Sequence, residues 1–394
     1  MYYITYKNLG KVYETVPNHV TSVVDKLFAG EEVNEHINYS VSVKSIRTIT
    51  KAFTSHNQIK YSRKHPYSVV QLYDKLDELV RKYPLESRHT QYMTFKIPKR
   101  SGGLRDICAP LDEFKEDLRQ VVHLINSGLH ILPHDSAWAY VPGRDVVGAM
   151  QEHTKNGSRW YLKLDFKNFF GSCTPEFVSA QLLKLYPLCD GVLIPQSARR
   201  IADNIANIST LNDGLPQGTP LSPMLTNLIM VPIDYEINKA LYNSTALQQQ
   251  KYVYTRYADD IIISAKEKFD YDKVIEIINN ILRDTPLKLN PDKTRFGSSA
   301  GRNWNLGVMC NKDNKITVGY RNKQKLKPII NNYIKDHKNN ILWEEHDLQW
   351  LLGQLSWLNN VEPDYYTGFC EYLYNKHGIQ IKDAIISDIR KHTI

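Results

Sequence analysis

The chain has 394 residues, more than one hydrophobic core usually supports, so we expect two or three lobes, each with a core of its own. Hydrophobic residues at 42% and charged residues at 23% are ordinary globular proportions, which exclude a long disordered protein and a coiled coil. Fifty Lys and Arg against 42 Asp and Glu give a net charge of only +8, so the distribution of charge is more informative than its total.

No targeting or membrane segment is visible. Residues 1–8 lack the basic-then-apolar order of a signal peptide, and no apolar run approaches the roughly 20 residues that a membrane helix needs. The five cysteines show no Cys-x-x-Cys spacing, which argues against a disulfide framework and a structural zinc site. We therefore expect a soluble, cytoplasmic protein without a membrane partner.

Two stretches concentrate positive charge. Residues 36–73 contain six Lys or Arg and no acidic residue, and residues 311–340 contain eight basic and two acidic residues, so each carries a net +6. Tyrosines are interleaved with these charges, as in surfaces that contact phosphates and stack bases. A solvated charged face is the alternative interpretation.

Apolar periodicity predicts the elements in chain order. They are a helix over 111–129, a strand over 159–165, helices over 176–185 and 222–241, a hairpin of strands 251–257 and 261–265, a helix over 270–283 and a strand over 304–309. Pro232 should kink or interrupt the helix that contains it. The order of strands and helices is that of a split βαβ, ferredoxin-like sheet.

Such a sheet would bring Asp165, at the end of one strand, beside Asp259 and Asp260 at the tip of the hairpin. Like charges about 4 Å apart repel by about 4 kcal/mol at an effective dielectric constant near 20, so the cluster needs protons or cations. Oxygen ligands favour Mg²⁺, and two such ions can clamp the attacking and leaving oxygens of a phosphoryl transfer. Taken singly, these residues could be turn or helix-capping residues, but together they favour a two-metal site.

Seven short motifs follow one another in the sequence. They are Ile-Pro-Lys-Arg-Ser-Gly-Gly-Leu-Arg at 97–105, Ala-Tyr-Val-Pro-Gly-Arg at 139–144, Leu-Asp-Phe-Lys-Asn-Phe-Phe at 164–170, Leu-Pro-Gln-Gly-Thr-Pro-Leu-Ser-Pro at 215–223, Tyr-Ala-Asp-Asp at 257–260, Leu-Asn-Pro-Asp-Lys-Thr at 289–294 and Leu-Gly at 306–307. In this order the set resembles the reverse transcriptases, specifically the bacterial branch that includes group II intron and retron enzymes.

The resemblance implies an α+β right-hand polymerase with fingers, a ferredoxin-like palm and a helical thumb. The implied ranges are 1–90 for an N-terminal extension and part of the fingers, 91–158 for the fingers, 159–310 for the palm with a fingers insertion at about 175–213, and 311–394 for the thumb.

The resemblance also assigns the catalytic residues. Asp165 and Asp259 would hold two Mg²⁺ ions, with Mn²⁺ as an alternative, while Asp260 supports them and the carbonyl of Phe166 completes one coordination shell. Lys293 would be the acid that protonates the departing pyrophosphate, and a solvated turn lysine is the alternative.

Nucleotide and primer contacts follow in the same way. Phe170 falls where the family has an aromatic steric gate that selects dNTPs, although a core Phe would also fit this position. The other implied contacts are Gln217 and Gly218 in the nucleotide pocket, Lys99 and Arg105 on the triphosphate, and Leu306 and Gly307 at the primer end.

The chain departs from the retron pattern at two places. An Asn-Ala-x-x-His element is not evident between residues 170 and 215, and Ile-Thr-Val-Gly at 316–319 only approximates the Val-Thr-Gly element before the thumb. Only 87 residues follow the last motif, so we expect a thumb there and little else. These features favour a stand-alone bacterial enzyme, similar to those of antiphage defence systems.

The expected reaction is therefore addition of dNTPs to a DNA or RNA primer on an RNA template, which in a defence system would be a structured non-coding RNA. Untemplated or protein-primed synthesis of the abortive-infection type is one alternative, motivated by the 25 tyrosines, and a retron reverse transcriptase is another. A non-catalytic RNA-binding module is disfavoured, because nothing would then compensate the repulsion between the carboxylates.

Overall fold

The computed structural model describes residues 10–11, 34–35, 66–98, 102–129, 131–186, 188–189, 193, 195–243, 251–301, 304–311 and 313–392. Positions 36–65 of the first basic stretch, and Lys312 of the second, lie outside the described residues. The short strands β1 (Gly10–Lys11) and β2 (Asn34–Glu35) pair in parallel.

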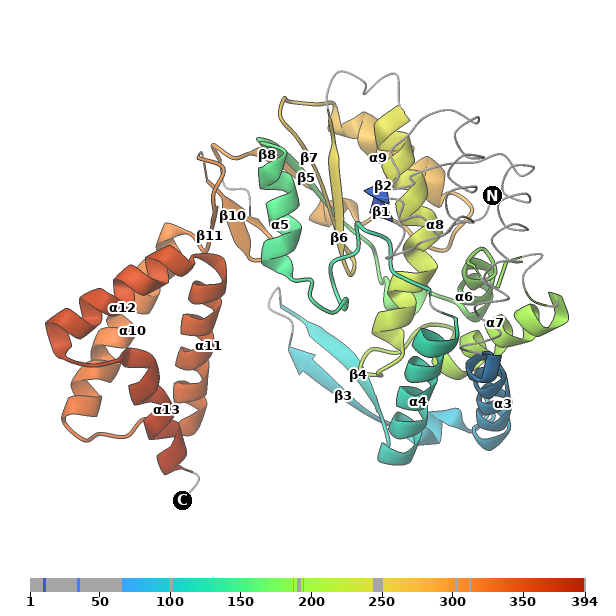
Figure 1. The fold of residues 1–394 in the computed structure, drawn as a ribbon, viewed down its shortest axis with the longest axis horizontal. Coiled ribbons are helices and arrows are strands. Elements are labelled where there is room, and N and C mark those ends of the chain that lie inside the picture. The colour runs from blue at the N-terminus through green and yellow to red at the C-terminus, as the bar shows by residue number, and fades with distance from the viewer. Residues whose placement is uncertain are drawn as a thin grey trace. The chain divides into compact units, whose positions relative to one another are not determined.

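The chain forms two compact units that are interleaved along the sequence (Figure 1). The first comprises Met1–Gly143, Asp165–Ala246 and Asp272–Asp292, and the second comprises Arg144–Leu164, Leu247–Tyr271 and Lys293–Ile394. The expected fingers, palm and thumb boundaries are a different, functional division of the chain, and they stay a prediction.

The first unit is mainly helical. Its elements are α3 (Pro66–Lys82), η1 (Arg88–Gln91), α4 (Asp112–Gly128), α6 (Pro175–Leu182), α7 (Pro195–Ser209), α8 (Ser222–Asn243) and most of α9 (Tyr271–Leu282). In α4 the apolar residues at helical spacing, among them Phe114, Leu118 and Val121, are buried, as the sequence predicted. Helix α8 is continuous through Pro232, so the expected interruption does not occur, and a kink there stays a prediction.

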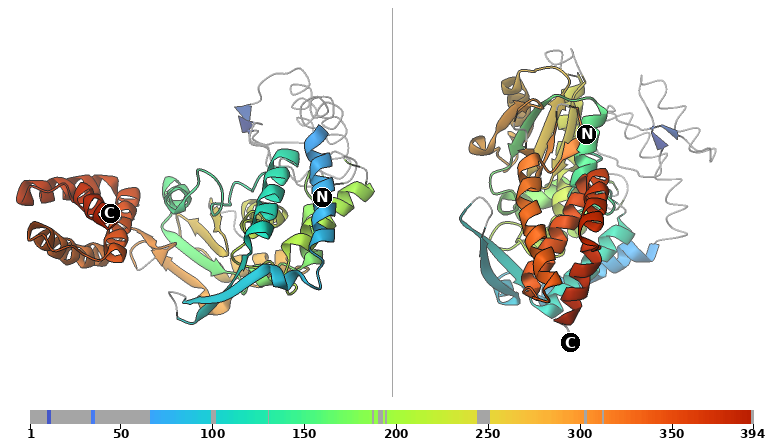
Figure 2. Two further views of the ribbon diagram at one scale, coloured as in Figure 1. Left: turned by 90° about the horizontal axis from the view of Figure 1, so that it is seen from below. Right: turned by 90° about the vertical axis from the view of Figure 1, so that its left-hand side faces the viewer.

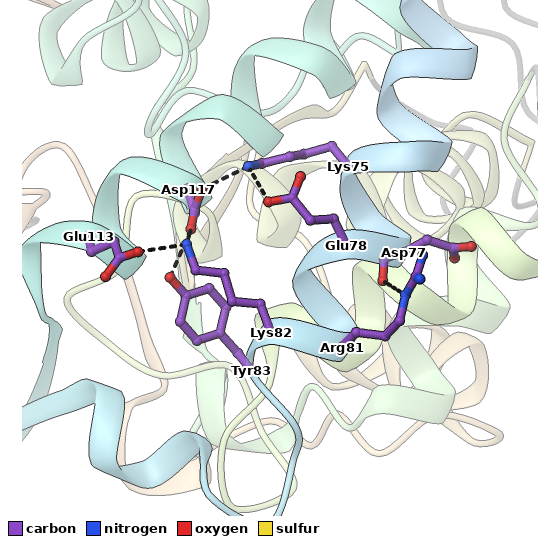
Figure 3. A network of polar contacts seen from close by, with 8 residues as sticks. All are labelled: Lys75, Asp77, Glu78, Arg81, Lys82, Tyr83, Glu113 and Asp117. Carbon is purple, nitrogen blue, oxygen red and sulfur yellow. Dashed lines mark hydrogen bonds and ion pairs between the residues drawn. The ribbon is translucent and has the colours of Figure 1, made fainter.

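Helices α3 and α4 are joined by a polar network on Asp117 (Figure 3). The Asp117 carboxylate of α4 is buried and accepts hydrogen bonds from Lys82 Nζ at 2.9 Å and Tyr83 Oη at 2.8 Å. Lys75 Nζ lies 2.9 Å from its other oxygen. The three donors compensate the cost of burying this carboxylate, so the network fixes the two helices against each other.

A two-stranded ribbon projects from the same unit. Strand β3 (Tyr92–Pro98) pairs antiparallel with β4 (Leu104–Pro110), with Ile97 opposite Arg105. Most residues of β3 are exposed, including Met93 and Phe95, whereas Ile107 and Cys108 of β4 are half-buried.

The second unit is built on a four-stranded sheet with the order β6-β7-β5-β8. The strands are β5 (Trp160–Asp165), β6 (Val253–Tyr257), β7 (Asp260–Ala265) and β8 (Arg295–Ser298), and α5 (Val146–Lys155) packs against β6. Strand β7 is buried from Ile261 to Ala265, which explains its continuous apolar run.

A buried histidine joins α5 to this sheet. His153 has no exposed surface, its Nδ1 lies 2.6 Å from Ser264 Oγ, and its Nε2 lies 2.8 Å from Thr255 Oγ1. Burial lowers the pKa of His153 to about 3, so the ring is neutral at physiological pH.

The rest of the second unit is a small sheet and a helical bundle. Strands β9 (Trp304–Asn305), β10 (Val308–Cys310) and β11 (Ile316–Thr317) form a three-stranded antiparallel sheet. Helices α10 (Tyr320–Lys338), α11 (Glu345–Val361), α12 (Pro363–His377) and α13 (Ile381–Lys391) follow and lie side by side in both Figures 1 and 2. A core that includes Ile330, Leu351 and Ile385 holds the bundle together.

One predicted strand is corrected. The segment 304–309 is not a single strand of the large sheet but the hairpin β9–β10, and β8 supplies the edge strand beside β5. The reason is local, because Leu306 and Gly307 both have positive φ, at 52° and 85°, which reverses the chain between Asn305 and Val308. Within the described residues, no helix is both long and apolar enough to cross a membrane.

Candidate active site

The three predicted carboxylates lie at the ends of neighbouring strands. Strand β5 ends at Asp165, which is 5% exposed, and β7 begins at Asp260. The strand order makes β5 and β7 hydrogen-bonded neighbours, as the predicted ferredoxin-like topology requires.

Asp259 occupies a two-residue turn between β6 and β7. Tyr257 pairs with Asp260, so Ala258 and Asp259 alone make the turn. Ala258 has φ of 56°, a left-handed conformation that is strained for a residue with a Cβ. Arg256 is fully buried, and its Nη1 donates to the Ala258 carbonyl at 3.2 Å. The turn is therefore held in a sparsely populated backbone conformation by a buried cation.

A basic residue that we did not predict contacts this site. Lys163 Nζ lies 2.9 Å from Asp260 Oδ1, and the two side chains are 23% and 24% exposed. Alternation along β5 puts the side chain of Lys163 on the same face as that of Asp165, which follows two residues later. Alternation in residues 159–165 could have placed Lys163 on the face of Asp165, although it does not reveal Asp260 as its partner.

This ion pair matters for the electrostatics of the site. Among the described residues, no three His, Cys, Asp or Glu side chains are arranged as a ready metal-binding cluster. Asp260 instead has its negative charge compensated by Lys163. The donor set of Asp165, Asp259 and a backbone carbonyl is nevertheless all hard oxygen, which suits Mg²⁺.

The backbone that follows Asp165 is paired with the Leu-Asn-Pro-Asp-Lys-Thr motif. Asn290 N donates to Asp165 O at 2.8 Å, Lys167 N donates to Lys288 O at 2.8 Å, and Phe166 forms an isolated bridge with Leu289. These bonds fix the carbonyl end of Asp165 and the peptides on either side of Phe166.

The three phenylalanines after Asp165 differ in burial. Phe166 and Phe169 are buried and stack on each other with ring centroids 5.2 Å apart. Phe170, which begins the short helix η2 (Phe170–Ser172), is only partly buried, and its carbonyl accepts from Leu215 N at 2.9 Å. The core alternative therefore fits Phe166 and Phe169, and the steric-gate role of Phe170 stays a prediction.

The motif at 215–223 packs against strand β4. The Gln217 carbonyl accepts from Cys108 N at 2.8 Å. Gly218 has φ of 112°, and a Cβ there would lie 2.8 Å from Ile107 Cγ2 and 3.1 Å from Cys108 O. The close approach of the backbone to β4 therefore requires a glycine at position 218. We did not predict this structural reason. Its contact with a nucleotide stays a prediction.

The predicted triphosphate contacts are placed only in part. Arg105 is exposed on β4, and alternation puts it on the same face as Ile107, the face that meets Gly218. On the other face Lys96 Nζ pairs with Asp106 Oδ1 at 3.2 Å. Lys99 lies outside the described residues.

The remaining predicted residues lie in short turns. Lys293 is exposed at the end of the helix η3 (Pro291–Lys293). Leu306 and Gly307 form the turn between β9 and β10, where the Leu306 side chain packs on a core with Val308 and Gly307 is exposed. Within this turn Leu306 is therefore anchored by packing, and Gly307 is accessible.

Comparisons with known proteins identify the family. Residues 97–339, more than half of the 394-residue chain, match the family model described as reverse transcriptase (RNA-dependent DNA polymerase). The retron Ec83 reverse transcriptase of Escherichia coli is 27% identical over 333 residues, which cover 82% of this chain and 95% of that protein. The retron Mx65 reverse transcriptase of Myxococcus xanthus is 31% identical over 232 residues, which cover 57% of this chain and 52% of that protein.

Solved structures add little to this assignment. Apo telomerase from Candida tropicalis aligns with a TM-score of 0.44 and 13% identity, covering 79% of this chain and 66% of that one. A similarity at this level carries no argument, so the assignment rests on the family match. The chain belongs to the reverse transcriptase family: it is an RNA-directed DNA polymerase of the α+β, right-hand class that uses an RNA template, and it resembles the retron enzymes of bacteria.

Proposed function

We propose that Asp165, Asp259 and Asp260 are the catalytic carboxylates with which this enzyme extends a primer 3′-hydroxyl. The observation that carries the proposal is that β5 ends at Asp165 beside β7, which begins at Asp260. The buried Arg256 and the strained Ala258 support it, because backbone strain persists where the surrounding structure over-determines a functional turn.

Two Mg²⁺ ions, or Mn²⁺ in their place, are the proposed cofactors, and the family as a whole generally depends on divalent metal. Asp165, Asp259 and the carbonyl of Phe166 would hold them. Bound magnesium would supply charge neutralisation for the phosphates and a lower pKa for the primer hydroxyl. Asp260, paired with Lys163, would support these ligands without carrying an uncompensated charge.

Selection of the incoming dNTP is the proposed task of the segments around Phe170 and Gly218. Phe170 would abut the sugar and leave no room for a 2′-hydroxyl, and Gln217 would line the pocket beside Gly218. Arg105 would bind the triphosphate with its guanidinium, together with Lys99. The exposure of Arg105 and the partial exposure of Phe170 support these roles.

Leaving-group and primer contacts complete the proposal. Lys293 would give a proton to pyrophosphate, which is consistent with its exposed position in a short turn. The exposed Gly307, next to the anchored Leu306, would support the primer end. The basic residues of α10 would contact the phosphates of the primer and template.

The template that we propose is a structured non-coding RNA, read in the bacterial cytoplasm by a retron-type enzyme. The support is the similarity to retron reverse transcriptases over 82% of this chain, despite the altered Val-Thr-Gly element. A role in antiphage defence is the biological setting that we propose.

Primer extension by the purified protein tests the activity. With Mg²⁺, dNTPs and a DNA primer on an RNA template, wild-type protein should make full-length DNA, and the Asp259→Asn/Asp260→Asn variant should make none. Asp364→Asn, at an exposed carboxylate of α12, is the control for loss of a charge and should remain active. Equal extension by the double variant would refute the assignment of the carboxylates.

The same reaction distinguishes protein-primed synthesis. Exposed tyrosines such as Tyr320, which is 74% exposed, could act as primers. DNA of random sequence that stays attached to protein until protease treatment would favour this alternative over templated synthesis.

A further inference from the structure

The junction between the small sheet and the helical bundle is organised by one carboxylate. Glu362 lies between α11 and α12 and caps both helices. Its Oε2 accepts hydrogen bonds from Thr317 Oγ1 at 2.8 Å and from Val318 N at 2.9 Å, and its Oε1 accepts from Lys323 Nζ at 2.8 Å. We call these four residues the Glu362 cluster; it joins β11 and α10 to the junction of α11 and α12.

The backbone of Glu362 is fixed as firmly as its side chain. Glu362 N donates to Leu358 O at 2.8 Å, and Glu362 O accepts from Tyr366 N at 2.9 Å. One residue therefore joins the end of α11 and the start of α12 to the chain segment between β11 and α10.

Burial makes these contacts strong. The side chains of Glu362 and Lys323 are 15% and 17% exposed, and Lys323 Nζ also lies 4.3 Å from the ring centroid of Tyr365. A charged acceptor with three donors in a partly desolvated site is more strongly bound than a surface ion pair. Removing the carboxylate would leave Lys323 and the Val318 amide without their acceptor in a largely buried site.

The Glu362 cluster is connected to the turn at 306–307. Thr317 pairs with Met309 across β10 and β11, and β10 pairs with β9 through that turn. Leu306 also packs on a core that contains Leu358 and Val361, the residues just before Glu362 in α11. The turn and the bundle are thus linked twice, through strand pairing and through a shared core.

We propose that Glu362 is a positioning residue that holds the turn at 306–307 and the basic helix α10 in one fixed arrangement, and so sets the affinity for primer-template. The inference rests on the proposed primer contact of that turn. Nucleic acid that contacts both parts binds a preorganised surface only while the Glu362 cluster is intact. Once it is broken, binding must also restore their order.

The test is primer-template binding by the full chain, measured with a labelled DNA primer on an RNA template. Glu362→Gln keeps the shape of the side chain but loses the charge, and it should raise the primer-template Kd about tenfold. The number of nucleotides added per binding event, with heparin as a trap, should fall in parallel. The dNTP KM and kcat at saturating primer-template should stay within twofold of wild type.

Two further variants make the result decisive. Glu371→Gln, an exposed glutamate in α12, makes the same chemical change and should leave the Kd unchanged. Thr317→Val removes one hydrogen bond and should raise the Kd about threefold, and it decides the matter if Glu362→Gln fails to fold. A Kd equal to that of wild type in a folded Glu362→Gln or, failing that, Thr317→Val protein would overturn the proposal, even if its melting temperature falls.

The outcome is independent of the proposed catalytic residues, because the Kd is measured without turnover. If wild-type protein binds primer-template and fails to extend it, the proposed function is wrong while the comparison between Glu362→Gln and Glu371→Gln still decides the role of Glu362.

Discussion

The large sheet of the second unit and the β3–β4 ribbon of the first unit hold residues with different proposed roles, and they are stabilised very differently. Strands β5 and β7 are largely buried and flanked by further strands, whereas most of β3 is exposed and pairs only with β4. A two-stranded ribbon gains little stability by itself. The proposed catalytic carboxylates are therefore on the more buried element, and Arg105 is on the more exposed one.

The largest expected effect is a difference in stability between these two regions. Ile262→Ala in β7, where the side chain is 1% exposed, should lower the free energy of unfolding by about 2–5 kcal/mol, because it leaves a cavity in the sheet core. Phe95→Ala in the ribbon, where the side chain is 47% exposed, should cost less than about 1 kcal/mol. Urea denaturation of both variants measures the difference, and equal losses would contradict the comparison.

As the pH falls, the large sheet should lose stability before the ribbon does. The pKa of His153 is about 3 in the folded chain and near 6.5 when unfolded, so the unfolded state binds the extra proton between these values. Stability should therefore fall as the pH drops from about 6.5 to 3, by on the order of 1 kcal/mol per pH unit. Denaturation of wild type and His153→Gln across this range provides the check, and an identical pH dependence in the two proteins would exclude His153 as the cause.

The contact between Gly218 and β4 offers a smaller perturbation that acts where the 215–223 motif meets the ribbon. Gly218→Ala places a Cβ against Ile107 and Cys108 at a φ of 112°, which costs about 1–3 kcal/mol of strain. We expect primer extension to slow about tenfold while the melting temperature changes by only a few degrees. The matched control is Gly353→Ala, a helical glycine with nothing within 4 Å of the added Cβ, and it should retain full activity. Full activity in both variants would show that the ribbon tolerates displacement.

The smallest expected effect concerns the charge balance of the sheet. Lys163→Met removes the partner of Asp260 and leaves the strand ends more negative. The Mg²⁺ concentration for half-maximal activity should then fall about fivefold, consistent with about 1 kcal/mol for a partly exposed ion pair. Lys382→Met, at an exposed lysine of α13, controls for the loss of a positive charge. An unchanged Mg²⁺ requirement in Lys163→Met would mean that Lys163 does not compete with the cation.

Local sequence signals predicted the individual strands of the sheet, but they did not predict the contacts between distant segments. Alternation in 159–165 and the short 258–260 connection identified β5, β6 and β7, because each is set by its own residues. The edge strand β8 was missed because its pairing with β5 joins segments more than a hundred residues apart. The roles of Lys163 and Glu362 were missed for the same reason, since a charged side chain shows no pattern that reveals its partner.

Family motifs added the residues that no periodicity could identify, such as Phe170 and Gln217. The altered Val-Thr-Gly element at 316–319 also led us to favour a stand-alone enzyme over a retron enzyme. The relatives that match this chain are retron reverse transcriptases. In the structure this element is tied to the helical bundle. Thr317 and Val318 are held by Glu362 through a hydroxyl and a backbone amide, and most residues could supply the amide.

The central claim is that the strand ends of the large sheet carry out nucleotide addition. Single-nucleotide incorporation by Asp165→Asn, measured at saturating primer-template with binding measured in parallel, tests it most directly. We expect normal primer-template affinity and a rate at least about a thousandfold lower, since several kcal/mol of transition-state stabilisation would be lost. Incorporation at the wild-type rate, by a variant protein that binds normally, would contradict the account.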